Sequence, residues 1–158
     1  MRTSLALVAL GLCLCITFSL PAVGAEKPIV IGAPLATAFL YGWDAERGIK
    51  LAVEEINSAG GVNVGGTKRP FSVEVIDTRD LEPSVPISDA LLGVEKLILE
   101  KKADFIVGGP VRSEAAIAAM DLLSKYKKLS ILTTGVLTPA YTQKVTENYS
   151  KYKYCFRN

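Results

Sequence analysis

Short apolar, β-branched runs alternate with longer amphipathic stretches along most of this chain, and no other feature restricts the fold as strongly. The runs that predict strands cover residues 28–32, 71–76, 104–108, 129–133 and 152–156. The stretches that predict helices cover residues 41–59, 87–98, 115–123 and 139–145. Strands separated by helices require right-handed crossovers, which place helices on both faces of a parallel sheet. The sequence therefore predicts a three-layer α/β/α fold.

The first predicted helix has the clearest amphipathic pattern. Its apolar positions recur at a spacing of three to four residues: Ala45, Ile49, Ala52, Val53 and Ile56. We expect this stripe to face the sheet. Gly60 and Gly61 follow it, and glycine adopts the left-handed conformation that commonly ends a helix. A turn at Gly65 and Gly66 then leads into the second strand.

The first 25 residues have the three-part layout of a secretory signal peptide. Arg2 precedes an uncharged apolar run from Leu5 to Leu20, and a stretch of small residues ends at Ala25. We therefore predict cleavage before Glu26, with residues 26–158 as the exported part. The run is 16 residues long, shorter than the ~20 residues that cross a membrane. A retained signal anchor is the alternative.

The composition of residues 26–158 argues against several classes of function. Their 17 basic and 16 acidic side chains nearly cancel and form no basic run, so we expect no nucleic-acid partner. The chain has no histidine, which removes histidine-based catalytic triads and imidazole zinc sites. Only one cysteine lies in this part, so no cluster has metal-ligand spacing and no metal is predicted. The glycine motifs that bind nucleotide phosphates are also missing, and we expect no cofactor.

Three residues allow more than one interpretation. Cys155 is a buried apolar residue, a free thiol or half of a disulfide, and its position between two aromatic residues favours burial. Asp77 and Asp80 follow the second strand, where carboxylates form metal or phospho-acceptor sites. For Asp77 we favour the simpler interpretation, in which a carboxylate at a strand end accepts hydrogen bonds from turn amides.

The loops after the first, third and fourth strands are the predicted ligand site. Ligands of open parallel sheets bind beyond the carboxyl ends of the strands, which places these loops, residues 33–44, 109–114 and 134–138, around the site. Ser113 stands where it can cap the third helix, and the backbone N–H groups of that helix start can hold a carboxylate or phosphate. The alternative is that Ser113 is only a cap and that Gly108-Gly109 is only a tight turn.

A set of short segments occurs in one characteristic order along the exported part. They are Ile29–Pro34, Tyr41-Gly42, Gly48, Ala52–Asn57 and Ala59–Gly61, followed by Asp77, Lys96–Ile98, Gly108, Ser113 and Phe156-Arg157. Together they resemble the N-terminal part of the type I periplasmic binding proteins of the branched-chain amino-acid transport class. The resemblance extends from Pro28 to Asn158.

This resemblance implies a solute receptor and not an enzyme. Such receptors have two lobes joined by a hinge, close on a small molecule in the cleft, and pass it to the membrane permease of an ABC transporter in the periplasm. The chain stops at Asn158, about where the crossover into the second lobe begins, so we expect residues 26–158 to be the N-terminal lobe of a longer protein. The open edge of the sheet should then expose apolar surface. The alternatives are a sensory module of the same fold and a flavodoxin-like or nucleotide-binding enzyme.

The resemblance also implies which residues bind the solute. The expected aromatic cover aligns with Tyr41, and the hydroxyl expected after the third strand aligns with either Arg112 or Ser113. Arg112 can also pair with a carboxylate through two parallel hydrogen bonds. In the last loop this chain has Gly135-Val136-Leu137 where the amino-acid binders have a small-small-Thr sequence, so Thr134 or Thr138 supplies the hydroxyl instead. The predicted ligand-binding residues are Tyr41, Arg112, Ser113, Thr134, Gly135 and Leu137.

Two of these residues have a simpler alternative role. Tyr41 is also explained as an aromatic residue that packs at a helix start. Arg112 is also explained as a surface residue paired with Glu114. The only tryptophan, Trp43, provides a fluorescence reporter if it borders the cleft.

Overall fold

The computed structural model describes residues 26–135 and 138–158, so the predicted signal peptide, residues 1–25, lies outside the described residues. The strands are β1 (Ile29–Leu35), β2 (Val62–Val64), β3 (Thr67–Arg69), β4 (Phe71–Asp77), β5 (Phe105–Gly108), β6 (Leu129–Leu132) and β7 (Cys155–Arg157). The helices are α1 (Leu40–Ser58), α2 (Ile87–Leu99), α3 (Ser113–Lys125), α4 (Pro139–Glu147) and α5 (Tyr149–Tyr152).

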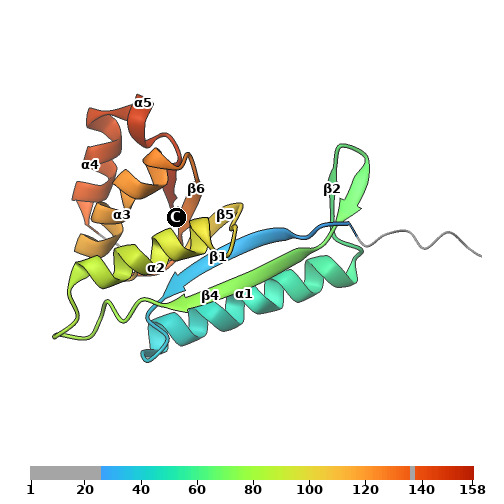
Figure 1. Cartoon of the computed structure of the whole chain (residues 1–158), viewed down its shortest axis with the longest axis horizontal. Helices are drawn as coiled ribbons and strands as arrows, with labels where there is room; N and C mark the ends of the chain where they lie inside the picture. The colour runs from blue at the N-terminus through green and yellow to red at the C-terminus, as the bar shows by residue number, and fades with distance from the viewer. Residues whose placement is uncertain (1–25, 136–137) are drawn as a thin grey trace, which may run out of the picture.

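Five of the strands form one parallel sheet in the order β4-β1-β5-β6-β7. Helix α1 packs on one face of this sheet, and α2 packs on the other with α3 beside it (Figure 1). Helices α4 and α5 lie against α3 at the end of the molecule away from α1 (Figure 1). The predicted parallel α/β sheet with helices on both faces is confirmed.

The face that α2 and α3 cover, called here the closed face, carries the hydrophobic core. Ile106 of β5 and Met120 of α3 belong to one cluster of buried side chains on this face. A Cβ atom at Gly32 would lie 2.8 Å from the Cβ atom of Ala103, so glycine is what allows the chain after α2 to approach β1. Cys155 is buried in the same cluster, as predicted. It is a free thiol, and burial raises its pKa to about 11.

The opposite face is covered over only part of its width. Helix α1 packs mainly on β4 and β1, whereas the outer part of this face carries Phe105 of β5, Ile131 of β6 and Phe156 of β7. These three side chains, called here the open face, are 36%, 39% and 50% exposed, respectively. Exposed apolar surface was expected at the open edge of the sheet. It occurs on the edge strand β7 and on β6 and β5, which follow it in the sheet.

The orientation of α1 differs in part from the prediction. Ala45, Ile49 and Val53 are partly buried, but Ala52 and Ile56 of the predicted stripe are exposed. Helix α1 lies over the edge strand β4 and its neighbour β1, and it buries a single row of side chains there. At the end of this row the Asn57 side chain donates to the carbonyl oxygen of Phe71 and accepts from its N–H group, both at 2.8 Å. Gly60 and Gly61, both at positive φ, follow the helix end as predicted.

Two segments were assigned wrongly or missed. The predicted strand at 152–156 is divided, because α5 ends at Tyr152 and β7 begins at Cys155. The turn at Gly65 and Gly66 joins β2 and β3 in an antiparallel hairpin that the prediction did not contain. In the described part of the chain, no helix has both the length and the apolar character needed to span a membrane.

Candidate ligand site

Loops from four strands meet at the carboxyl edge of the sheet. The residues that follow β1, β4, β5 and β6 emerge there because all four strands are parallel. Leu35 and Asp77 are paired at the ends of β1 and β4, and Gly108 and Leu132 at the ends of β5 and β6. The predicted site loops are therefore neighbours in the structure.

Asp77 joins the loop after β4 to the loop after β1. Its Oδ1 atom accepts hydrogen bonds from the N–H groups of Thr37 and Arg79, both at 3.1 Å. The N–H group of Thr78 donates to the carbonyl oxygen of Leu35 at 2.9 Å and reinforces the same connection. The interpretation of Asp77 as a carboxylate that satisfies turn amides is confirmed.

Asp80 joins the loop after β4 to the loop after β5. It is 2% exposed, and its Oδ2 atom accepts a hydrogen bond from the N–H group of Arg112 at 2.6 Å. Its Oδ1 atom accepts from the hydroxyl of Thr78, which is also buried. From the sequence Asp80 is predicted only as a metal or phospho-acceptor candidate. Its partner lies 32 residues away, and a local pattern does not reveal such a contact. Among the described residues no group of acidic or cysteine side chains is placed to hold a metal ion.

The prediction that Ser113 caps the third helix is wrong. Helix α3 begins at Ser113, and the capping position is occupied by Arg112, whose side chain makes no capping hydrogen bond. Asp80 accepts from the Arg112 N–H group and so holds the residue that precedes the helix, although this bond does not replace a side-chain cap, which would bind N–H groups of the first turn of α3. Both Arg112 and Ser113 are partly exposed at this edge.

Arg112 pairs with Glu114 in this structure. The Nε atom of Arg112 lies 3.3 Å from the Oε2 atom of Glu114. A hydrogen bond from the backbone N–H of Glu114 itself lowers the pKa of that carboxyl, and the Arg112 side chain lowers it further. A carboxylate is therefore already present at the start of α3, where the helix dipole favours negative charge.

Thr134 and Gly135 bring the loop after β6 against the loop after β5. The Thr134 hydroxyl donates to the carbonyl oxygen of Gly108 at 3.1 Å. Gly135 has a φ of 75°, and a Cβ atom there would lie 2.7 Å from the carbonyl oxygen of Val111. Glycine is thus required both for the backbone conformation and for the contact between the two loops. Thr138 caps α4 by accepting from the Ala140 N–H group at 3.3 Å.

Tyr41 lies at the same edge but apart from the other predicted residues. It is in the first turn of α1 with 66% of its surface exposed. Within the described residues its side chain makes no hydrogen bond or ion pair. Trp43 is also exposed there, and the Arg47 guanidinium lies 3.6 Å from the centre of its ring. An exposed aromatic group therefore borders the loops.

Four of the six predicted ligand residues form one group. Arg112, Ser113, Thr134 and Gly135 come from two loops that contact each other through Gly108 and Val111. Tyr41 approaches from the separate loop after β1. Leu137 lies outside the described residues. This edge offers backbone groups, hydroxyls and guanidinium groups, which are suited to holding a small polar molecule.

The likeness of this chain to known proteins is confined to its structure. No protein-family model and no curated protein sequence matches it. One similar solved structure is an ABC transporter substrate-binding protein from Sphaerobacter thermophilus, with a TM-score of 0.58 and 23% identity over 83% of this chain. Another is an ABC-type branched-chain amino acid transporter from Rhodopseudomonas palustris CGA009, with a TM-score of 0.53 and 19% identity over 66% of this chain. A third, an ABC transporter from Rhodopseudomonas palustris, has a TM-score of 0.51 and 16% identity over 79% of this chain.

The matched regions are only parts of those proteins. This chain covers 32%, 26% and 36% of the three structures, respectively, or about a third of their length. At these identities the likeness establishes the fold. The predicted fold resemblance, to a single lobe of the type I periplasmic binding proteins, is confirmed.

Proposed function

We propose that this protein is an extracytoplasmic solute receptor that binds an amino acid or another small carboxylate-bearing solute for an ABC transporter. In this proposal residues 1–25 are a cleaved signal peptide, and residues 26–158 are the N-terminal lobe of a two-lobe protein in the periplasm. The second lobe closes over the solute, and the closed receptor delivers the solute to a membrane permease.

The meeting of the loops after β1, β5 and β6 at one edge of a parallel sheet carries this proposal. Open parallel sheets bind ligands at this edge, and the fold is similar to that of ABC transporter substrate-binding proteins. In the described part of these loops no nucleophilic side chain is paired with a general base. The hydroxyls, backbone groups and guanidinium of these three loops suit the binding of a small polar molecule.

The polar end of the solute is assigned to the loops after β5 and β6. Arg112 exchanges its weak, exposed pairing with Glu114 for two parallel hydrogen bonds to the solute carboxylate. The Ser113 hydroxyl adds a further donor beside it. Because Thr134 already donates its hydroxyl hydrogen to Gly108, its oxygen acts as an acceptor, which suits an ammonium group.

The apolar end of the solute is assigned to Tyr41 and Leu137. The exposed ring of Tyr41 has surface available to cover a side chain. Gly135 lets the loop after β6 approach Val111 closely, and its contribution to the solute site is assigned to its backbone groups.

The test is a binding assay with matched variants. The coding sequence after Asn158 is read first, and the assay uses the full product of that reading frame. Branched-chain amino acids and small carboxylates without an amino group are titrated while Trp43 fluorescence and calorimetric heat are recorded. We expect Arg112→Gln and Tyr41→Ala each to weaken binding by about tenfold, since one charge-assisted contact or one aromatic contact is lost.

The matched control is Tyr149→Ala. Tyr149 is 67% exposed, almost the same as Tyr41, but it lies on α5, away from the carboxyl edge. Its loss should leave affinity unchanged. Equal binding by the wild type, Arg112→Gln and Tyr41→Ala would refute the assigned site, and a stop codon directly after Asn158 would refute the two-lobe receptor.

A further inference from the structure

The charges of this chain are unevenly distributed along it. Residues 26–120 contain ten basic and fourteen acidic side chains, whereas residues 121–158 contain seven basic and two acidic ones. The second segment includes the end of α3, all of α4 and α5, and β7. An almost neutral protein therefore has a strongly basic C-terminal segment, and this end of the chain includes α5 (Figure 1).

An open surface hollow of about 600 Å³ lies at this end. Its lining comes from the second half of α3, from α5 and from the residues that lead into β7, and it includes four lysines: Lys125, Lys127, Lys151 and Lys153. These residues precede β6 and β7, so the hollow is at the amino edge of the sheet, opposite the candidate ligand site. We call it the basic pocket.

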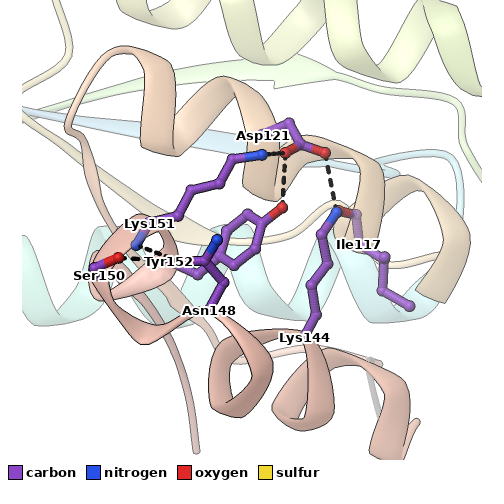
Figure 2. Close-up of polar contacts among 7 residues, drawn as sticks. All are labelled: Ile117, Asp121, Lys144, Asn148, Ser150, Lys151 and Tyr152. Atoms are coloured by element: carbon purple, nitrogen blue, oxygen red, sulfur yellow. Dashed lines mark hydrogen bonds and ion pairs between the residues drawn. The ribbon is translucent and has the colours of Figure 1, made fainter.

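The acidic residue in the lining, Asp121, is already fully engaged. Lys151 and Lys144 donate to its two carboxylate oxygens at 2.5 Å and 3.0 Å, and the Tyr152 hydroxyl donates at 2.9 Å (Figure 2). The hydrogen bond from Lys151 is the main reason that the pKa of Asp121 is lowered strongly. Asp121 therefore stays ionised, and its charge is already balanced by Lys144 and Lys151.

The other lysines of the pocket have little compensation. Lys125 approaches Glu95 only to 3.7 Å, and its side chain is 63% exposed. Lys127 and Lys153 are exposed, and within the described residues neither forms an ion pair. Lys127 is held at a φ of 52° in the turn after α3, where its N–H group donates to the carbonyl oxygen of Ser124. The pocket thus concentrates positive charge, and a bound anion would relieve the repulsion.

We propose that the basic pocket binds a phosphomonoester group. Lysine ammonium groups bind phosphate as point charges and do not need the planar geometry that arginine imposes on a carboxylate. A hollow lined by four lysines suits a compact dianion, whereas an acidic peptide would need an extended groove. The group belongs either to a soluble phosphate ester or to the headgroup of an anionic lipid.

Two probes with the same headgroup chemistry distinguish these sources. Glycerol 3-phosphate is titrated by calorimetry, and co-sedimentation is measured with phosphatidylcholine vesicles that contain or lack phosphatidic acid. Binding of glycerol 3-phosphate supports a soluble ester as the ligand, and binding only to vesicles with phosphatidic acid supports a headgroup. Either binding should weaken as ionic strength rises. If neither probe binds, the proposal is overturned.

The variant Lys127→Gln/Lys153→Gln removes the two uncompensated amines and leaves the Asp121 contacts intact. We expect it to weaken binding by about tenfold, since two exposed charge contacts are lost. The control Lys27→Gln/Lys102→Gln makes the same change in net charge at exposed positions outside the pocket, and circular dichroism verifies the fold of both. Equal losses in the two double variants overturn the proposal, because they would show a response to net charge alone. Tyr41→Ala should leave this binding unchanged, so the two sites fail independently.

Discussion

The two faces of the sheet differ in how completely the described chain covers them. On the closed face Ile106 is 1% exposed, whereas on the open face Ile131, on the neighbouring strand, is 39% exposed. The strand order explains this difference. Helix α1 connects β1 to β4 in one direction along the sheet, and α2 and α3 connect β4 to β5 and β5 to β6 in the other. Right-handed crossovers therefore place α1 on one face and both later helices on the opposite face.

The same reversal of direction locates the candidate site. Strands β1 and β5 are neighbours from which the connections run in opposite directions, and the loops after such strands separate and leave a crevice. Asp77 holds the loop before α1, and Asp80 holds the loop before α3. The open face and the candidate site are thus two consequences of one topology.

The largest expected effect on stability is the difference between two isoleucine-to-alanine substitutions, one on each face of the sheet. Ile106→Ala should lower the free energy of unfolding by about 3 kcal/mol, because it leaves a cavity in a closed core. Ile131→Ala should lower it by less than about 1 kcal/mol, because solvent already reaches that side chain. Urea denaturation of both variants measures the difference. Equal losses would show that the open face is covered in solution.

The two loop carboxylates extend the comparison to the carboxyl edge. Asp80→Asn should cost about 2 kcal/mol, since a buried carboxylate with two donors becomes a weaker acceptor. Asp77→Asn should cost about 0.5 kcal/mol, because Asp77 is exposed and water can replace its contacts. Denaturation gives the stabilities, and hydrogen exchange at the Arg112 amide locates the change. An unprotected Arg112 amide in the wild type would contradict the role assigned to Asp80.

The fold was predictable where local pattern and tertiary packing agree. Alternating runs identified the strands of the sheet, and Gly60 and Gly61 identified a helix end. The segment 152–156 misled the prediction because Tyr152, Tyr154 and Phe156 alternate with other residues as they would in one strand. In the structure Asn148 accepts from the Lys151 N–H group and starts a helical turn there.

The candidate site was predictable in position but not in detail. The rule that ligands bind at the carboxyl edge identified the correct loops. The partners within those loops are non-local: the Arg112 amide is held by Asp80 and the Thr134 hydroxyl by Gly108. A capping rule that considers only neighbouring residues assigned Ser113 the capping position, which Arg112 occupies in the structure. Tyr41 and Leu137 remain predictions, because an exposed ring and a residue outside the described part carry no contact that fixes their role.

A smaller effect is expected at Asp121, which ties α4 and α5 to α3 beside the closed face. Asp121→Asn should cost about 1 kcal/mol near neutral pH, a value reduced because the side chain is half exposed. The pKa of Asp121 is lower in the folded than in the unfolded state, so the folded state binds fewer protons. Its stabilisation is therefore complete above the unfolded pKa of about 4 and is lost as pH falls below it.

The measurement for Asp121 is the difference in unfolding free energy between the wild type and Asp121→Asn as a function of pH. The difference should shrink steadily below pH of about 4, where the Asp121 carboxylate of the unfolded chain becomes protonated while that of the folded protein stays ionised to lower pH. A difference that stays constant across the acid range would mean that the contacts of Asp121 with Lys144 and Lys151 do not stabilise the fold.

The smallest effect on stability, and the most direct test of the open face, is expected from Phe156→Ser. Phe156 is 50% exposed, so its loss should change the free energy of unfolding by less than about 1 kcal/mol. It should nevertheless reduce self-association, since Phe105, Ile131 and Phe156 form adjacent apolar surface. Light scattering over a concentration series measures this, with Tyr149→Ser, on α5, as the control for loss of an exposed aromatic side chain. If both variants change association equally, the open face is not what drives it, and the contrast between the two faces would be a difference in packing only.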